Sequence, residues 1–393
     1  MMETEPKLPE DLVFAEILPK LPAKTLMQFK CVSKSWSTRI SGDSSFIAAH
    51  LNHHHSNNTT RLAIALSVDY IESQRNPTLM QKTMSLLSYE GSRVSSDIDT
   101  SYLAKVTPTI VGSCNGLLCL QVLDPRQEME PLVLWNPATR QYAFVDKQAA
   151  ITDPPIFSLG FGFDEESNDY KIVKILASCE GDPAAKAAPL LSLYAQVFSK
   201  GSGRWRGEKE GGRRGSVSGL TRLRTIQSPV AADGALHWIG FKRDGDNHRK
   251  SMNIILSFDL RDEVLQVREA PIRSGYLALY KWKGSLAALE ILRTSQLENC
   301  LWAVTAKDDN NDAKHCFKWS KMFTIRQSLS ESAVVRWVWK DQILLEKKCG
   351  RDHRAELFLL DPVTGQLRMI NRPQASWFLH DAHDYVESLV SVF

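Results

Sequence analysis

A loose repeat runs through most of the chain and limits the fold more than any other feature of the sequence. In its first complete copy, Asn115-Gly116 precedes the apolar run Leu117 to Val122, and a second run ends at Asn136-Pro137. An Asn-Gly pair between apolar runs predicts a hairpin, because both central residues of a type I′ turn need a positive φ. Repeats of roughly 40–50 residues with several strands each are typical of propeller blades, so we expect a β-propeller rather than a β-sandwich. Further copies begin at Asp233-Gly234, at Trp339-Lys340-Asp341 and, less completely, at Lys283-Gly284.

Short apolar runs bounded by turn signals continue from about residue 61, and no long amphipathic helix interrupts them. Such runs between clusters of Gly, Pro, Asn and Asp predict strands. This region is therefore expected to be all-β. The predicted strands include residues 110–111, 117–122, 131–135, 170–176, 191–198, 235–240, 254–260, 334–339, 343–346 and 357–360.

The first fifty residues have a helical pattern instead. Pro9-Glu10-Asp11 places a proline and two acids where a helix begins. Apolar residues then recur at helical spacing from Leu12 to Leu21, and Pro22 can open the next helix. Two more short helices are predicted over Thr25 to Lys30 and Ser33 to Ile40. Such a small helical head buries little surface alone, so either a partner protein or the rest of the chain must complete its core.

These patterns predict a multidomain chain that combines a helical domain with an all-β domain. Residues 1–50 form the helical domain, residues 51–108 a linker with the first β elements, and residues 109–393 the β domain. The 43% hydrophobic and 24% charged content is that of an ordinary globular protein. A formal charge of +3 is too small to indicate a polyanionic partner for the whole molecule.

Composition also excludes several classes of protein. No run approaches the ~20 apolar residues that cross a bilayer, so we expect no membrane partner. The seven cysteines include no CxxC pair, which argues against both a zinc ribbon and a disulfide scaffold. A reduced compartment, the cytoplasm or the nucleus, is therefore expected.

Several motifs between residues 8 and 36 match one family pattern. They are Leu8-Pro9-Glu10-Asp11-Leu12, Ile17-Leu18, Leu21-Pro22-Ala23-Lys24-Thr25-Leu26 and Phe29-Lys30-Cys31-Val32-Ser33-Lys34-Ser35-Trp36. Together these motifs resemble an F-box.

Motifs of the second region resemble the plant F-box-associated domain, which S-locus F-box proteins and their relatives carry. They are Gly112-Ser113-Cys114-Asn115-Gly116-Leu117-Leu118-Cys119, Leu134-Trp135-Asn136-Pro137-Ala138-Thr139 and Gly160-Phe161-Gly162-Phe163-Asp164 with Asp169-Tyr170-Lys171-Ile172-Val173. The resemblance implies a small three-helix F-box followed by a kelch-like β-propeller.

The same resemblance implies a non-catalytic role in a ubiquitin ligase. In this family the F-box packs against a Skp-type adaptor, which links it to a cullin and a RING subunit, and the β domain captures a protein substrate for ubiquitination. No catalytic residue, metal or cofactor is expected, because holding a substrate near the conjugating enzyme acts by proximity. The alternative is that the matching residues form only the core of a small helical domain. By motif position the adaptor-facing residues are Leu8, Pro9, Leu12, Leu18, Pro22, Leu26, Val32 and Trp36.

The head departs from the usual F-box spacing at one place. Between Leu8 and Pro22 the chain is one residue longer, around Val13-Phe14-Ala15. An extra residue turns an α-helix by ~100°, so we expect the first turn to shift relative to the adaptor.

A different function is suggested by the basic, glycine-rich segment Lys200 to Arg224. Gly/Arg tracts with an aromatic residue, here Trp205, can bind RNA through phosphate contacts and base stacking. Such a run is more often a solvated loop between blades, which we favour, so a nucleic-acid partner is the alternative rather than the main hypothesis.

Two weaker patterns suggest catalysis or metal binding. Gly112-x-Cys114-x-Gly116 has the spacing of a nucleophile elbow, which would make the chain a cysteine hydrolase, but that motif joins a strand to a helix and here a hairpin is expected. His53-His54-His55 lacks the further ligands of a closed metal site, so we expect these histidines in a solvated linker.

Overall fold

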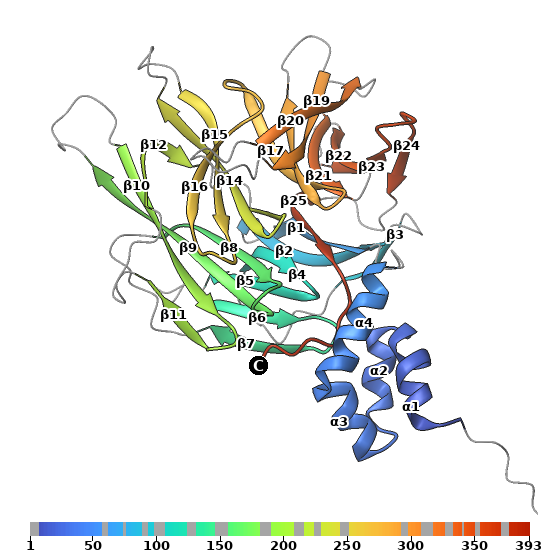
Figure 1. The fold of residues 1–393 in the computed structure, drawn as a ribbon. Coiled ribbons are helices and arrows are strands. Elements are labelled where there is room, and N and C mark those ends of the chain that lie inside the picture. Colours follow the sequence, from blue (N-terminus) through green and yellow to red (C-terminus); the bar gives the residue numbers. More distant parts are fainter. Residues whose placement is uncertain are drawn as a thin grey trace, which may run out of the picture.

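A computed structural model of the chain shows a helical lobe beside a larger body of strands (Figure 1). The lobe comprises α1 (Glu10–Leu12), η1 (Val13–Ile17), η2 (Leu18–Lys20), α2 (Ala23–Phe29), α3 (Lys34–Gly42) and α4 (Ser44–Ser56). The structure describes residues 8–56, 62–73, 76–88, 93–97, 107–123, 131–145, 156–180, 190–207, 216–223, 229–243, 251–291, 298–307, 317–326, 333–339, 342–349, 354–370 and 377–393.

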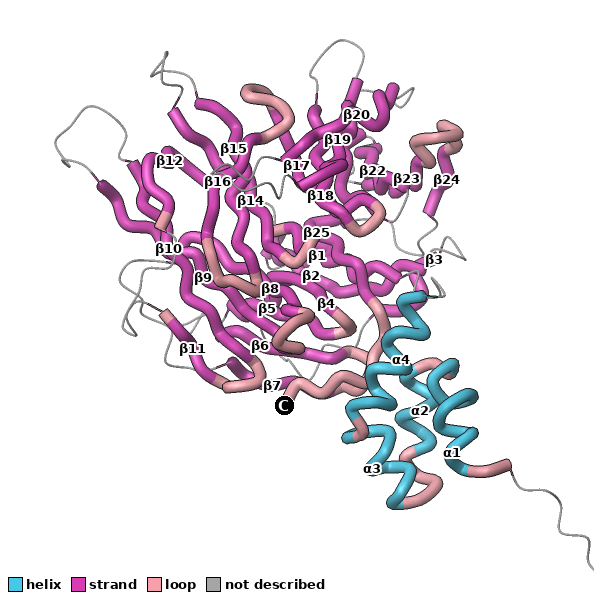
Figure 2. The backbone as a smooth tube through the Cα atoms, viewed as in Figure 1, coloured by secondary structure: helices cyan, strands magenta, loops and turns pink. Residues whose placement is uncertain are grey.

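The strands form five antiparallel sheets, and Figure 2 shows how they make up the body of the molecule. Four sheets have four strands each, in the orders β25-β1-β2-β3, β4-β5-β6-β7, β17-β18-β19-β20 and β21-β22-β23-β24. Their bounds are β1 (Leu62–Ser73), β2 (Asn76–Ser88), β3 (Arg93–Asp97), β4 (Thr107–Cys114), β5 (Leu117–Leu123), β6 (Leu132–Asn136), β7 (Gln141–Val145), β17 (Tyr276–Trp282), β18 (Ser285–Ile291), β19 (Glu298–Lys307), β20 (Phe317–Arg326), β21 (Ala333–Trp339), β22 (Gln342–Cys349), β23 (Arg354–Leu360), β24 (Leu367–Ile370) and β25 (Trp377–Tyr385).

The fifth sheet has nine strands and consists of two blades joined along one edge. Strands β8 to β11 belong to one blade and β13 to β16 to the next, while β12 pairs with both β10 and β14. The strands are β8 (Ile156–Asp164), β9 (Asp169–Glu180), β10 (Leu190–Ser199), β11 (Arg204–Arg206), β12 (Val217–Leu223), β13 (Val230–Ala232), β14 (Ala235–Arg243), β15 (Ser251–Asp259) and β16 (Leu265–Glu269).

Contacts between blades close a ring. Strands β25, β4, β8, β14, β17 and β21 touch one another in that cyclic order, and β21 touches β25 again. The described strands therefore form six blades of a β-propeller, which confirms the predicted fold. The ring is closed by β25, which pairs with β1 from Leu62↔Tyr385 to Asp69↔Trp377.

The turns repeat as the sequence predicts. Asn115-Gly116, Asp233-Gly234 and Lys283-Gly284 all have positive φ at both residues, from 48° to 89°, and each joins the first two strands of a blade. An Asx turn joins the third and fourth strands of three blades. There the Oδ1 atoms of Asn136, Asp259 and Asp361 each accept two backbone N–H groups.

Tryptophans of the body serve packing. Trp135, Trp238, Trp282 and Trp339 are buried in the propeller, and Trp302 and Trp337 are partly buried against its apolar clusters. Aromatic side chains on strands contribute large apolar areas of this kind. These tryptophans therefore stabilise the propeller by packing between its strands.

The histidine-rich stretch corrects an expectation. His53, His54 and His55 lie on the last turn of α4 rather than in a solvated linker, and His54 is buried. Asp43 caps the start of this helix: its carboxylate accepts the backbone N–H groups of Ser45 and Phe46.

Replacing Gly116 by alanine tests how closely the chain packs around the β4–β5 turn. A Cβ at Gly116, where φ is 82°, would meet Ser388 and lie 2.6 Å from the Val386 carbonyl oxygen. At Gly284 φ is 89°, but a Cβ added there would have no atom within 4 Å outside its own chain neighbours. Gly284→Ala should cost ~1–2 kcal/mol through backbone strain alone, and Gly116→Ala should cost about 1–3 kcal/mol more. Chemical denaturation measures both, and equal losses would contradict the close packing.

Candidate functional site

The helical head has a compact aromatic core. Phe14 lies in edge-to-face contact with Trp36 and Phe46, with ring centroids 5.2 and 5.4 Å apart. The Arg39 guanidinium stacks 3.8 Å from the centroid of Phe14 and bonds to Asp11 at 3.2 Å. The buried members of this core are Phe14, Leu18, Ala23, Leu26, Ile40, Phe46 and Leu389.

The extra residue of the head is taken up by a π-helical turn, η1. The backbone N–H of Leu18 bonds to the carbonyl oxygen of Val13, five residues earlier. A single π turn contains one residue more than an α turn, and such turns are frequent at functional sites. Phe14, within η1, and Leu18, which follows it at the start of η2, both reach the core. The expected shift of the first turn relative to an adaptor stays a prediction.

The predicted adaptor-facing residues divide into two groups. Leu18 and Leu26 are buried in the core, and Trp36 is partly buried, so these residues support the surface from within. The other five, Leu8, Pro9, Leu12, Pro22 and Val32, are exposed. Whether the eight residues contact an adaptor stays a prediction.

The exposed apolar residues of the head include one that the motif comparison missed. Leu8, Leu12 and Val32 are 58%, 47% and 60% exposed, and Ile17, at the end of η1, is 42% exposed. The apolar spacing of the first helix includes Ile17, but only the π turn shows that it faces solvent. Four large apolar side chains of this small lobe are thus in contact with water.

Two histidines fasten α4 to the turn before α2. The Nε2 atoms of His50 and His54 donate to the Leu21 carbonyl oxygen at 3.1 and 3.3 Å. Burial, and to a lesser extent the neighbouring His54, lower the pKa of His50 to about 4. Burial also lowers the pKa of His54. Both rings are therefore held in the neutral form near pH 7.

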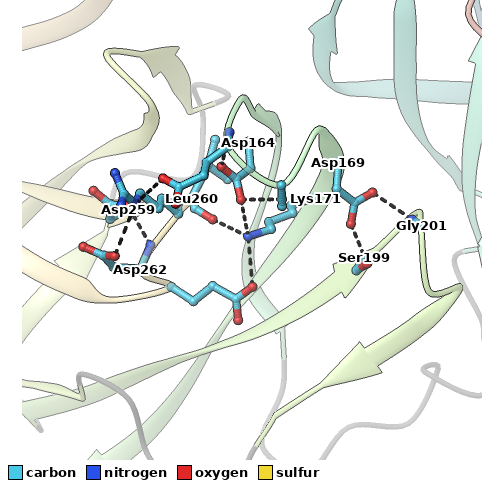
Figure 3. A network of polar contacts seen from close by, with 12 residues as sticks. Asp164, Asp169, Lys171, Ser199, Gly201, Asp259, Leu260 and Asp262 are labelled. Carbon is cyan, nitrogen blue, oxygen red and sulfur yellow. Dashed lines mark hydrogen bonds and ion pairs between the residues drawn. The ribbon is translucent and has the colours of Figure 1, made fainter. Parts of the chain in front are cut away.

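A second candidate site lies between two blades of the propeller. The buried Lys171 ammonium bonds to Asp164 at 2.9 Å, to the Leu260 carbonyl oxygen at 2.5 Å and to Glu263 at 3.1 Å (Figure 3). Asp164 and Lys171 come from β8 and β9, whereas Leu260 and Glu263 follow β15. Burial tends to raise the pKa of Asp164, but hydrogen bonds from Ser167 and Lys171 outweigh it and keep that pKa below its usual value.

A polar depression of about 600 Å³ adjoins this network. The basic side chains that line it are already paired: Arg206 bonds to Glu263 at 2.5 Å, Arg261 bonds to Glu166 at 2.6 Å, and Lys171 bonds to Asp164. A charged ligand would have to displace one of these partners, so we interpret the network as a connection between blades. Among the described residues, no group of three His, Cys, Asp or Glu side chains is placed to hold a metal ion.

The nucleophile suggested by the sequence has no catalytic surroundings. Cys114 ends β4 immediately before the Asn115-Gly116 hairpin, not before a helix. Burial raises the pKa of the Cys114 thiol to about 12, so almost no thiolate forms near neutral pH. His237 is committed elsewhere, to Ser257 and the Ala232 carbonyl oxygen.

The described part of the basic segment offers little to a nucleic acid. Trp205 packs on Phe198, and the Lys174 ammonium lies 3.9 Å from its ring centroid. Phe198 and Lys174 therefore cover the Trp205 ring. Arg206 is paired with Glu263. Residues 208–215 and 224 of the predicted RNA-binding segment lie outside the described residues. No helix in the described ranges is long and apolar enough to span a bilayer.

Comparison with known families agrees with this architecture. The sequence profile of the F-box associated beta propeller domain matches residues 77–392. The chain therefore belongs to the family of plant F-box proteins that carry an F-box-associated β-propeller domain.

Curated relatives come from Arabidopsis thaliana. The F-box protein At5g10340 is 29% identical over 279 residues, which cover 67% of this chain and 58% of that protein. The F-box/kelch-repeat protein At3g23880 is 23% identical over 343 residues, covering 85% of this chain and 84% of that protein. The chain thus spans a little over half of the first relative and most of the second. Among solved structures, the β-propeller domain of the Trilobed protease from Pyrococcus furiosus is 8% identical, with a TM-score of 0.38 over 79% of each chain.

Stability of the head should fall on acidification because of His50. The pKa of this residue is 6.5 when unfolded and about 4 in the folded head. Above pH 6.5 the ring is neutral in both states, so its protonation does not reduce the free energy of unfolding. As the pH falls from 6.5 towards 4, the unfolded state binds a proton that the folded state does not, and up to about 3 kcal/mol is lost. Amide exchange of α2 and α4, corrected for intrinsic pH dependence, measures the loss. A head equally protected at pH 7 and pH 4.5 would contradict this account of His50.

Removing the Lys171 ammonium should destabilise the propeller. Lys171→Met leaves the buried Asp164 carboxylate and Glu263 without their shared cation, and breaking a buried pair in this way costs ~3–5 kcal/mol. Arg261→Met is the control, since the Arg261–Glu166 pair is largely exposed and should contribute only about 0–1 kcal/mol. Urea denaturation measures both; a small loss for Lys171→Met would show that solvent reaches the network.

Proposed function

We propose that this protein is the substrate-recognition subunit of an SCF-type ubiquitin ligase. Its head binds a Skp-type adaptor, and through it a cullin and a RING subunit, while the propeller binds a protein substrate. The matched F-box-associated domain and the F-box relatives support this assignment. The protein acts without a catalytic group of its own, in the cytoplasm or the nucleus.

The observation that carries the proposal is the exposed apolar surface of the head. Leu8, Leu12, Ile17 and Val32 face solvent although the residues beneath them form a packed core. The head also projects from the propeller rather than lying inside it (Figure 1). Covering this surface with an adaptor removes apolar area from water, at ~25 cal/mol per Å².

The propeller suits the receptor role for a physical reason. A closed ring of blades has no unpaired central edges and holds its surface turns in fixed positions. A substrate bound to those turns is kept at a set place relative to the head. The ligase then accelerates ubiquitin transfer by raising the effective concentration of a substrate lysine near the conjugating enzyme.

Charged substitutions on the exposed surface test the adaptor contact. Leu12→Asp and Val32→Asp each place a carboxylate where the proposed contact buries an apolar side chain, so adaptor affinity should fall by about 100-fold. Neither side chain belongs to the buried core, so the free protein should keep its melting temperature. Co-purification and titration with the adaptor measure the loss.

The matched control is Val363→Asp. Val363 is 74% exposed in the β23–β24 turn of the propeller, and this change should leave adaptor binding intact. Trp36→Ala is a less direct test because Trp36 packs on Phe14 and Phe29 inside the head. Adaptor binding that survives both Leu12→Asp and Val32→Asp would overturn the assignment of this surface.

A further inference from the structure

We propose that the segment Glu387–Val392 is a structural part of the helical head and is held in place by Asn136 of the propeller. The head is then fully folded, and competent to bind its partner, only when the propeller ring has closed. The part of this inference that concerns partner binding rests on the proposed function, whereas the folding part does not.

The head lacks two components that this segment supplies. Helix α2 begins at Ala23 after Pro22 and has no capping side chain of its own. The Glu387 carboxylate accepts the Ala23 backbone N–H, at the end of the helix where negative charge is favourable. Two residues later, Leu389 is buried in the head core with Phe14 and Leu26. The missing part of the small core therefore comes from the far end of the sequence.

Asn136 binds the segment through its side-chain amide. Its Nδ2 donates to the carbonyl oxygens of Ser388 at 3.0 Å and of Val390 at 2.7 Å. Meanwhile Oδ1 accepts the backbone N–H groups of Ala138 and Thr139 and closes the β6–β7 turn. One buried side chain thus joins a propeller turn to the segment that completes the head.

Comparison with the other blades separates the role of the Asn136 Oδ1 acceptor from that of its Nδ2 donors. The corresponding turns are closed by Asp259 and Asp361, whose carboxylates accept the same pair of N–H groups. An Asx turn requires only an acceptor, which aspartate supplies as well as asparagine. The turn alone would therefore accept aspartate at 136, and the donors of an amide are needed for Ser388 and Val390.

The segment is also fixed against the propeller on either side of Leu389. Ser388 lies against the β4–β5 turn so closely that a Cβ at Gly116 would collide with it. Val392 is buried in the core between the blade of β4 to β7 and the blade of β8 to β11. From the head side, His55 of α4 bonds to Asn115 of the same turn. The head and the propeller consequently share one interface that is built around this segment.

Chain topology links this interface to ring closure. The segment follows directly after β25, the strand that pairs with β1 and closes the ring. With β25 unpaired, the segment would no longer be attached to a closed ring, and only the contacts of Asn136, Ser388 and Val392 would keep Leu389 and Glu387 near the head. An open propeller would then carry a head whose core is filled only part of the time, which disfavours the entry of an unfinished receptor into the ligase.

The test is hydrogen exchange of the full chain carrying Asn136→Asp. This substitution keeps the turn acceptor but removes both donors and places a carboxylate oxygen opposite two carbonyl oxygens. We expect amide exchange to accelerate about 10-fold or more both in residues 387–392 and in α2 and α4, since two hydrogen bonds are lost. Strands β14 and β15 should exchange as in the parent protein. Asp361→Asn makes the reverse change in a turn that binds no such segment, and it should alter none of these rates.

A second variant addresses the core directly. Leu389→Ala leaves Asn136 intact and should accelerate exchange in α2 and α4 by a similar factor, because it opens a cavity in the head core. Faster exchange in residues 387–392 without any change in α2 and α4, in both variants, would overturn the proposal by showing that the head folds independently. Unchanged exchange of residues 387–392 in Asn136→Asp would overturn the role of Asn136.

Titration with a purified Skp-type adaptor separates this inference from the proposed function. If the parent chain binds, Asn136→Asp should weaken the affinity by about the factor seen in exchange, and Asp361→Asn should leave it unchanged. Full affinity in Asn136→Asp despite a loosened head would overturn the link between completion of the head and binding. A parent chain that does not bind the adaptor would refute the proposed function, while the exchange rates would still decide whether the segment completes the head.

Discussion

A helical lobe of about fifty residues buries little apolar surface by itself, and much of the arrangement of this molecule reflects that constraint. Part of the deficit is met from within the chain, because Leu389 enters the head core and Glu387 caps α2. The remaining apolar side chains, among them Leu12 and Val32, stay on the surface. The small size of the head therefore has two consequences. Its core is completed by the segment that follows β25, and several of its apolar side chains remain exposed.

The propeller is a closed body whose blades are connected to one another. Its ring is closed by β25 pairing with β1, and neighbouring blades are tied by contacts such as the buried Lys171 network. Cys114, the candidate nucleophile, is partly buried beside a hairpin turn, and burial raises the pKa of its thiol to about 12. These features suit a protein that holds two others in a fixed relation. The strand that closes the ring, β25, and the segment that enters the head core, residues 387–392, are adjacent in the chain. The proposed order of folding, ring first and head second, rests on that adjacency.

Local signals in the sequence were sufficient for much of the fold. Asn115-Gly116 and Asp233-Gly234 determine hairpins because the turn geometry depends on those residues themselves, and the repeat predicts the propeller. The number of blades was not predictable, since the β12–β14 pairing joins two blades into one sheet. The π turn at Val13–Ile17 was visible only as an extra residue, because spacing does not show whether a helix rotates or bulges. The role of Leu389 depends on a contact between distant parts of the chain, which no local pattern encodes.

The central claim is that the exposed apolar face of the head binds a Skp-type adaptor. Calorimetric titration of the purified full-length chain with a purified adaptor tests it most directly. The account predicts one adaptor bound per chain, with the negative heat-capacity change that burial of apolar surface produces. A titration without heat at several temperatures, together with separate elution of the two proteins on a sizing column, would contradict it.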